Sequence, residues 1–77
     1  MGNRYFIIFY CWFDTMAKMY LYHLAASITN GVYVNHRNAL QIISDKHKAE
    51  GHNISPQVIS ITNIIEISES DYIEFIK

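Results

Sequence analysis

The strongest feature of the hydrophobic pattern is an unbroken run of apolar and aromatic residues near the N-terminus, Tyr5–Phe13. The run is too short to span a membrane, which takes about 20 apolar residues. Its Phe, Tyr and Ile content favours a strand over a helix. Because strand side chains alternate between two faces, both faces of this strand are apolar. An edge strand of that kind would promote aggregation, so Arg4–Phe13 is predicted to be the central strand of a small sheet.

The next segment, Met16–Ile28, has two interpretations. As a helix it would be capped by Asp14 and would end at Asn30-Gly31, and its Ala, Leu and Met content favours that structure. As a strand it would form a hairpin with the first strand, and a turn or bulge would follow it. Local signals are balanced, and we favour the strand because it supplies a neighbour for the central strand.

A helix is predicted after a short extended piece, with Asn35 or Asn38 as its N-cap and Gly51 as its stop. Apolar residues at helical spacing form its buried stripe: Ala39, Leu40, Ile42 and Ile43. Charged and polar residues are assigned to its exposed side: Asp45, Lys46, His47, Lys48 and Glu50.

A third strand is predicted over Val58–Ile67, where Ile64-Ile65 interrupts the alternation and suggests a bulge. Ser68–Asp71 then has the form of a capping box and predicts a short C-terminal helix. Joined by a hairpin and a right-handed crossover, these elements give a ββαβα chain. The prediction is a single α+β domain, residues 1–77, with an antiparallel-type sheet in the order 2-1-3 and one helix on one face.

Composition narrows the classes of function. Hydrophobic residues make up 51% of the 77 residues and charged residues only 17%, which favours self-association, with a homodimer expected, or a bound partner. The net charge of −1 gives no basic surface for nucleic acid. The single cysteine, Cys11, excludes an internal disulfide. With no signal-peptide cleavage pattern and no membrane segment, a cytoplasmic location is expected.

Three stretches carry a resemblance to a known group of proteins: the aromatic first strand, the TNGVYVN turn of Thr29–Asn35, and the ending ITNIIEISESDYIEFIK of Ile61–Lys77. The chain resembles small proteins encoded by phages, prophages and mobile elements, which carry endings of the "ITNIIELSEEDY" type. It departs from them at Met19–Leu21, where that group has glycines. The resemblance implies an accessory protein that binds a host protein, including the inhibitors of CRISPR and other defence systems.

Motifs for catalysis or metal binding are weak. His36, His47, His52 and Cys11 lack the spacing of a zinc site. The chain contains no phosphate-binding loop and no nucleophile elbow. We therefore expect no enzyme activity, no cofactor and no metal. An acidic cluster near the C-terminus is interpreted as a dipole-matched helix start and a solvated surface: Glu66, Glu69, Asp71 and Glu74.

The aromatic excess is the best functional signal, because Tyr and Trp dominate the hot spots of protein interfaces. Tyr10, Trp12, Tyr20 and Tyr22 are expected together on the sheet face that the helix leaves uncovered; the alternative is that they fill the core. The predicted function is protein–protein binding, to a host protein or a second copy. The alternative function is a small-ligand or nucleotide pocket at a dimer seam, lined by Tyr20, Tyr22, His36 and Arg37.

Overall fold

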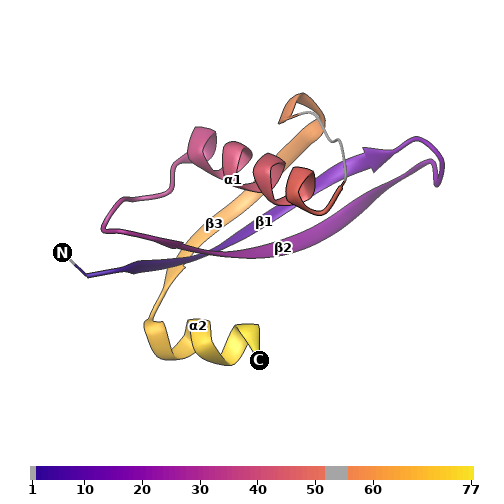
Figure 1. The fold of residues 1–77 in the computed structure, drawn as a ribbon. Coiled ribbons are helices and arrows are strands. Elements are labelled where there is room, and N and C mark those ends of the chain that lie inside the picture. Colours follow the sequence, from indigo (N-terminus) through magenta and orange to yellow (C-terminus); the bar gives the residue numbers. More distant parts are fainter. Residues whose placement is uncertain (1, 52–55) are drawn as a thin grey trace.

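The computed structural model describes residues 2–51 and 56–77 and has three layers, with helix α1 on one side of a sheet and helix α2 on the other (Figure 1). The elements follow one another as β1 (Arg4–Asp14), β2 (Met19–Thr29), α1 (His36–Ala49), the 3₁₀ turn η1 (Pro56–Val58), β3 (Ile59–Ile67) and α2 (Glu69–Ile76). The predicted ββαβα order and α+β class are confirmed.

The sheet has the order β2-β1-β3, and β1 runs antiparallel to both neighbours. The apolar run is therefore the central strand, as its two apolar faces predicted. The ambiguous segment forms the strand β2 and not a helix. All eleven of its residues pair with β1, from Met19 opposite Asp14 to Thr29 opposite Arg4. Pairing with β1 therefore outweighs the local helix propensity of this segment.

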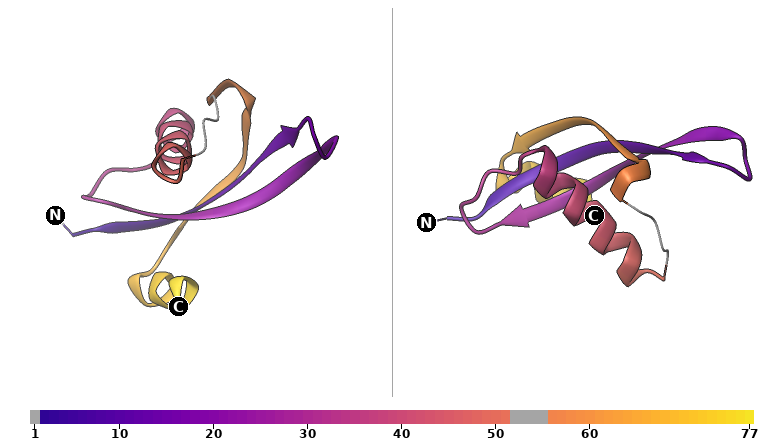
Figure 2. Two further views of the ribbon diagram at one scale, coloured as in Figure 1. Left: turned by 45° about the vertical axis from the view of Figure 1, so that its right-hand side comes forward. Right: turned by 90° about the horizontal axis from the view of Figure 1, so that it is seen from above.

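A four-residue turn, Thr15–Lys18, joins the two long strands. The Asp14 carboxylate accepts hydrogen bonds from the N–H groups of Met16 and Ala17 at 2.8 and 3.0 Å. Lys18 adopts a left-handed backbone with φ of 56°. The hairpin tip extends beyond both helices (Figure 2), and the molecule measures 42 × 22 × 22 Å. We call this projecting part of β1 and β2 the hairpin arm.

The bulge in β3 lies at Thr62, and the predicted position at Ile64-Ile65 is wrong. Phe9 pairs with Asn63, whereas Tyr10 pairs with Ile61, so Thr62 is the extra residue. Its hydroxyl donates to the Phe9 carbonyl at 3.1 Å. The shift turns Ile64 toward α1, like Ile59 and Ile61 before it, and this explains the apparent break in alternation.

The core lies between α1 and one face of the sheet. Its buried members come from every major element except α2: Phe6, Ile8, Tyr10, Ala25, Val34, Ala39, Ile43 and Ile59. Of the two predicted N-caps of α1, Asn35 is the one used: its side chain accepts from the Asn38 N–H at 2.8 Å, and Asn38, the third residue of the helix, accepts a longer contact from the Asn35 N–H at 3.5 Å. The helix ends at Ala49 with Glu50 as its C-cap, and Gly51 takes a φ of 86°.

Helix α2 is capped by Ser68, whose hydroxyl accepts from the Asp71 N–H at 3.1 Å. It packs on the other face of the sheet, where Tyr72 lies 5.1 Å from the ring of Tyr5. None of its residues is buried. The helix therefore shields only the end of the sheet nearest the N-terminus. No helix in the described part of the chain is long and apolar enough to cross a membrane.

Candidate interaction surface

Four large side chains stay exposed on the face opposite α1, along the half of the β1–β2 hairpin nearer its tip. Phe13 is 46% exposed, Tyr20 57%, Tyr22 73% and Leu24 47%. We call these four residues the open patch. The β1–β2 register assembles them, because Tyr20 lies opposite Phe13, Tyr22 opposite Cys11 and Leu24 opposite Phe9. The rings of Phe13 and Tyr20 meet edge to face at 5.3 Å.

A hollow of about 260 Å³ adjoins the open patch. Phe9, Tyr22, Leu24 and the bulge residue Thr62 form part of its lining, with Tyr10 and His23. The neighbouring thiol of Cys11 is free but buried between these larger side chains. Burial keeps it from solvent, so the surface offers apolar contact and not a nucleophile.

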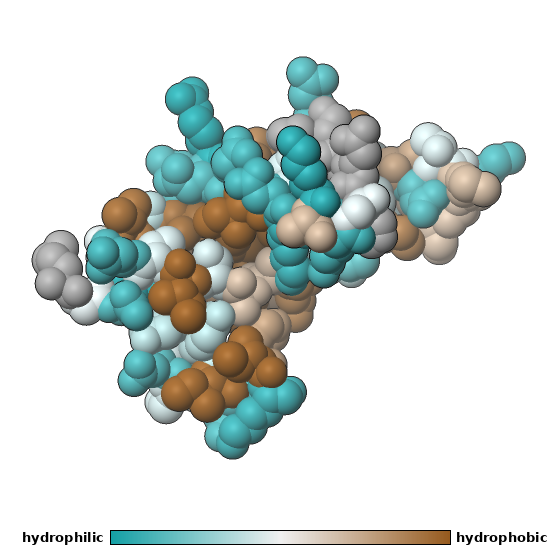
Figure 3. Space-filling model, viewed as in Figure 1, coloured by the Kyte–Doolittle hydropathy of each residue, from teal (hydrophilic) through white to brown (hydrophobic). Residues whose placement is uncertain are grey.

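Apolar side chains also remain exposed on α2. Ile73, Phe75 and Ile76 are each more than two-fifths exposed, whereas Tyr72 makes the aromatic contact with the sheet. Figure 3 shows that the outer side of α1 is hydrophilic, whereas hydrophobic side chains gather around α2. The molecule is therefore polar on the α1 side and apolar at several places around α2.

Tyr10 and Trp12 do not join Tyr20 and Tyr22, so the predicted grouping of the four aromatics is wrong. Tyr10 lies opposite His23 and Trp12 opposite Leu21. Residues opposite each other in a sheet share a face, and the face of Tyr10 is the one that α1 covers. Tyr10 and Trp12 therefore pack in or against the core, whereas Tyr20 and Tyr22 lie on the face that α1 does not cover.

Tyr10 and Trp12 form a ring cluster with two histidines under the C-terminal half of α1. The Tyr10 hydroxyl lies 3.0 Å from Nε2 of His47. Trp12 stacks on His23 at 4.4 Å between ring centroids and meets the edge of His47 at 4.8 Å. Burial, with a smaller contribution from the Glu50 carboxylate, raises the pKa of Tyr10.

His47 is only 6% exposed, and its assignment to the exposed side of α1 is wrong. It continues the buried stripe of Ala39 and Ile43 at steps of four residues, so helical spacing could have identified it. Its Nδ1 lies 3.8 Å from a Glu50 carboxylate oxygen. The place of His23 in the ring cluster could be predicted only from the β1–β2 register, because alternation alone does not show which face of β2 lies beside Tyr10.

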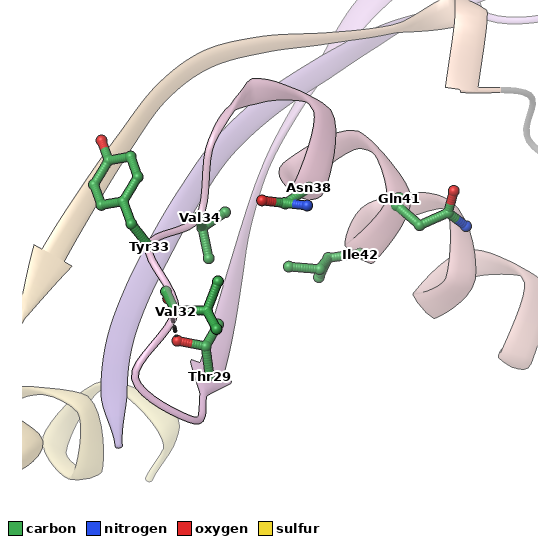
Figure 4. A pocket seen from close by; sticks show the side chains of 7 residues that line it. All are labelled: Thr29, Val32, Tyr33, Val34, Asn38, Gln41 and Ile42. Atoms are coloured by element: carbon green, nitrogen blue, oxygen red, sulfur yellow. Dashed lines mark hydrogen bonds between the residues drawn. The ribbon is translucent and has the colours of Figure 1, made fainter. Parts of the chain in front are cut away.

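His36 and Arg37 lie exposed in the first turn of α1, on the other side of the sheet from Tyr20 and Tyr22. Within one chain, His36 and Arg37 therefore do not share a pocket with the two tyrosines. A hollow beside the first turns of α1 is lined by other residues. Its volume is about 240 Å³, less than the roughly 300 Å³ at which small-molecule pockets begin. Figure 4 shows its lining: Thr29, Val32, Tyr33, Val34, Asn38, Gln41 and Ile42.

The acidic residues near the C-terminus are largely paired within the chain. Arg4 holds Glu66 through two hydrogen bonds, at 2.7 and 2.9 Å, and this contact lowers the pKa of Glu66. Tyr5 donates to Glu69 at 2.6 Å, and Lys77 pairs with Glu74 at 3.1 Å. Their geometry is that of local ion pairs and caps.

Within residues 2–51 and 56–77, no group of three His, Cys, Asp or Glu residues could hold a metal ion. His52, the fourth residue considered for such a site, lies outside the described residues.

A scan against protein-family models finds no match, and searches of curated proteins and of solved structures also find none.

Proposed function

We propose that this chain is a binding protein that acts through protein–protein contact, with the open patch as its recognition surface. The observation that carries the proposal is the exposure of Phe13, Tyr20, Tyr22 and Leu24 on one face of the β1–β2 hairpin. Aromatic side chains are enriched at protein interfaces, and Tyr is among the residues that contribute most when buried there.

The hairpin presents these side chains at a low cost in conformational entropy. Phe13, Tyr20, Tyr22 and Leu24 all project from two strands that pair along their full eleven residues, and a Phe or Tyr side chain has only two rotatable angles to fix on binding. A preorganised surface loses less freedom when a partner docks. The fold therefore supports recognition by a rigid apolar face.

The setting of this activity follows from the resemblance of the C-terminal segment, Ile61–Lys77, to small phage and mobile-element proteins. It supports a host protein as the partner, and a component of a defence system is the partner class that we propose. Self-association depends on a different feature of the molecule, the outer edge of β2.

The test compares two variants in a capture assay from a bacterial host lysate and in a phage-defence assay in the same host. Tyr20→Ser combined with Tyr22→Ser removes two exposed rings of the open patch. Val58→Ser is the matched control, because Val58 is also about half exposed but lies in η1. We expect the wild type and the control to capture the same protein and the double variant to lose it by at least tenfold.

Thermal unfolding of both variants checks that the fold is intact. Equal capture of that protein by the double variant and the control would show that the open patch is not the recognition surface.

A further inference from the structure

We propose that two copies of this chain join edge to edge along β2 and form one continuous six-stranded sheet. The strand order β2-β1-β3 leaves β2 at one end of the sheet. Among the described residues, no strand pairs with its outer side. Every second residue of such a strand directs its N–H and C=O away from the sheet, where they can pair with another chain.

The outer edge of β2 lacks the charges, prolines and bulges that commonly prevent such pairing. Its eleven residues, Met19–Thr29, include no Asp, Glu, Lys or Arg and no Pro. Its register with β1 continues through all eleven pairs without a shift, so no bulge bends it away. Natural edge strands are usually blunted by lysine, proline, bulges or short length. A long, uncharged and regular edge is a template for another strand.

The opposite edge, β3, carries the protections that β2 lacks. The bulge at Thr62 interrupts its register with β1. The Asn63 side chain accepts a hydrogen bond from the Ile64 N–H at 2.9 Å and so occupies one of the backbone donors. Glu66 adds a charge. One edge of the same sheet is thus guarded and the other is open, which points to β2 as the joining edge.

A second copy fits this edge because an antiparallel strand pair is self-complementary about a two-fold axis. In a continuous sheet, residues that lie opposite each other must be on the same face. On β2 the even-numbered residues, including Tyr20, Tyr22 and Leu24, share the face of the open patch. Even residues of one β2 strand then pair only with even residues of the other, and odd with odd. The two-fold axis must therefore pass beside one residue, which lies opposite the same residue of the second copy.

The eleven residues overlap completely only when that residue is Leu24, the midpoint of Met19–Thr29. Tyr22 would then lie opposite Ala26 of the second copy, and Tyr20 opposite Ile28 of the second copy. Leu24 would approach its own copy with about 5 Å between Cβ atoms. The two open patches would meet on one side of the sheet and form a single larger apolar surface.

The first test uses the wild-type chain. Light scattering and amide hydrogen exchange by NMR are measured from about 10 μM to 1 mM. We expect the mass to rise to that of two chains and exchange to slow at alternate residues of β2 over the same concentration range. A monomer throughout would overturn the proposal. A dimer whose outward β2 amides keep exchanging freely would also overturn it, because the copies would then meet through faces.

The second test places a single cysteine on the proposed axis. Leu24→Cys in a Cys11→Ala background is oxidised at the concentration where the dimer forms, and Ile65→Cys in the same background is the control. Ile65 is on the same face and exposed but belongs to β3. We expect at least a tenfold excess of covalent dimer with Leu24→Cys. Equal cross-linking at both positions would contradict the Leu24 axis.

The proposal is separable from protein binding by the open patch. A strictly monomeric chain that still captures a partner through Tyr20 and Tyr22 would overturn the β2 edge and leave the proposed function standing.

Discussion

The two faces of β1 are about equally apolar, yet they end in different environments. On the face toward α1, Phe6 and Ile8 are completely buried. On the other face, Phe13 remains nearly half exposed, beside Tyr20 and Tyr22 of the neighbouring strand. The hydrophobicity of a strand face thus shows that the face needs cover but does not show what supplies it.

The difference comes from the lengths of the covering helices. Helix α1 has 14 residues and spans about 21 Å, whereas α2 has eight and spans about 12 Å. An eleven-residue strand is about 37 Å long. Because α2 also packs near Tyr5 at the start of β1, it leaves the hairpin arm uncovered on that side. An external partner is the cover that we propose for this part of the sheet.

The largest expected effect separates the two faces by stability. Ile43→Ala on α1 removes a fully buried side chain and should lower the free energy of unfolding by about 3 kcal/mol. Leu24→Ala on the open patch should cost less than about 1 kcal/mol in the dilute monomer. Urea unfolding at low micromolar concentration measures both. Equal losses would mean that the open patch is covered within the chain.

The register that creates this difference was only partly predictable from the sequence. Apolar runs and connection rules were enough for the three strands, their order and the central position of β1. The grouping of side chains by face depends in addition on the length of the hairpin turn. Four turn residues place Asp14 opposite Met19. Even-numbered residues of β1 therefore lie opposite odd-numbered residues of β2 and share a side of the sheet with them. One residue more or fewer would have put Tyr10 and Trp12 beside Tyr20 and Tyr22.

The two histidines of the ring cluster show the same limit. Helical spacing with Ala39 and Ile43 marks His47 as buried, but its charged neighbours, Lys46 and Lys48, suggest an exposed segment. The bulge position was hidden for a related reason. Alternation along β3 shows that a shift occurs near its middle, and only pairing with β1 places it at Thr62.

A smaller effect is expected from the hydrogen bond inside the covered face. Tyr10→Phe removes the hydroxyl that contacts His47 and should cost about 1 kcal/mol of stability at neutral pH. Tyr22→Phe on the open patch is the matched control and should change stability by less than about 0.5 kcal/mol. Chemical denaturation of both variants gives the comparison. A cost for Tyr22→Phe as large as that for Tyr10→Phe would remove the distinction between the faces.

The buried hydroxyl of Tyr10 should also make the stability of the fold depend on pH in alkaline solution. Burial raises the folded-state pKa of Tyr10 above its unfolded value near 10. The associated stability is fully present below pH 10 and is lost as the pH rises through the folded-state pKa. Tyr10→Phe should therefore lose less stability between pH 9 and 11 than the wild type. An unchanged alkaline slope would contradict the raised folded-state pKa of Tyr10.

The smallest expected effect concerns the ion pair between the neighbouring strands β1 and β3, formed by Arg4 and Glu66. The hydrogen bond from Arg4 lowers the folded-state pKa of Glu66. Its contribution to stability is present above the unfolded pKa, near 4.5, and is lost as the pH falls through the folded-state value. Both side chains are partly exposed, so solvent and salt weaken the pair.

Glu66→Gln should therefore flatten the loss of stability below pH 5 slightly, and 0.5 M NaCl should reduce the difference from the wild type. Thermal unfolding from pH 3 to 7 at two salt concentrations measures this, with Glu74→Gln as the control for an exposed pair at the C-terminal end of α2. If Glu66→Gln instead weakens concentration-dependent association, then the β3 edge takes part in the dimer. The contrast between a guarded edge and an open one would then fail.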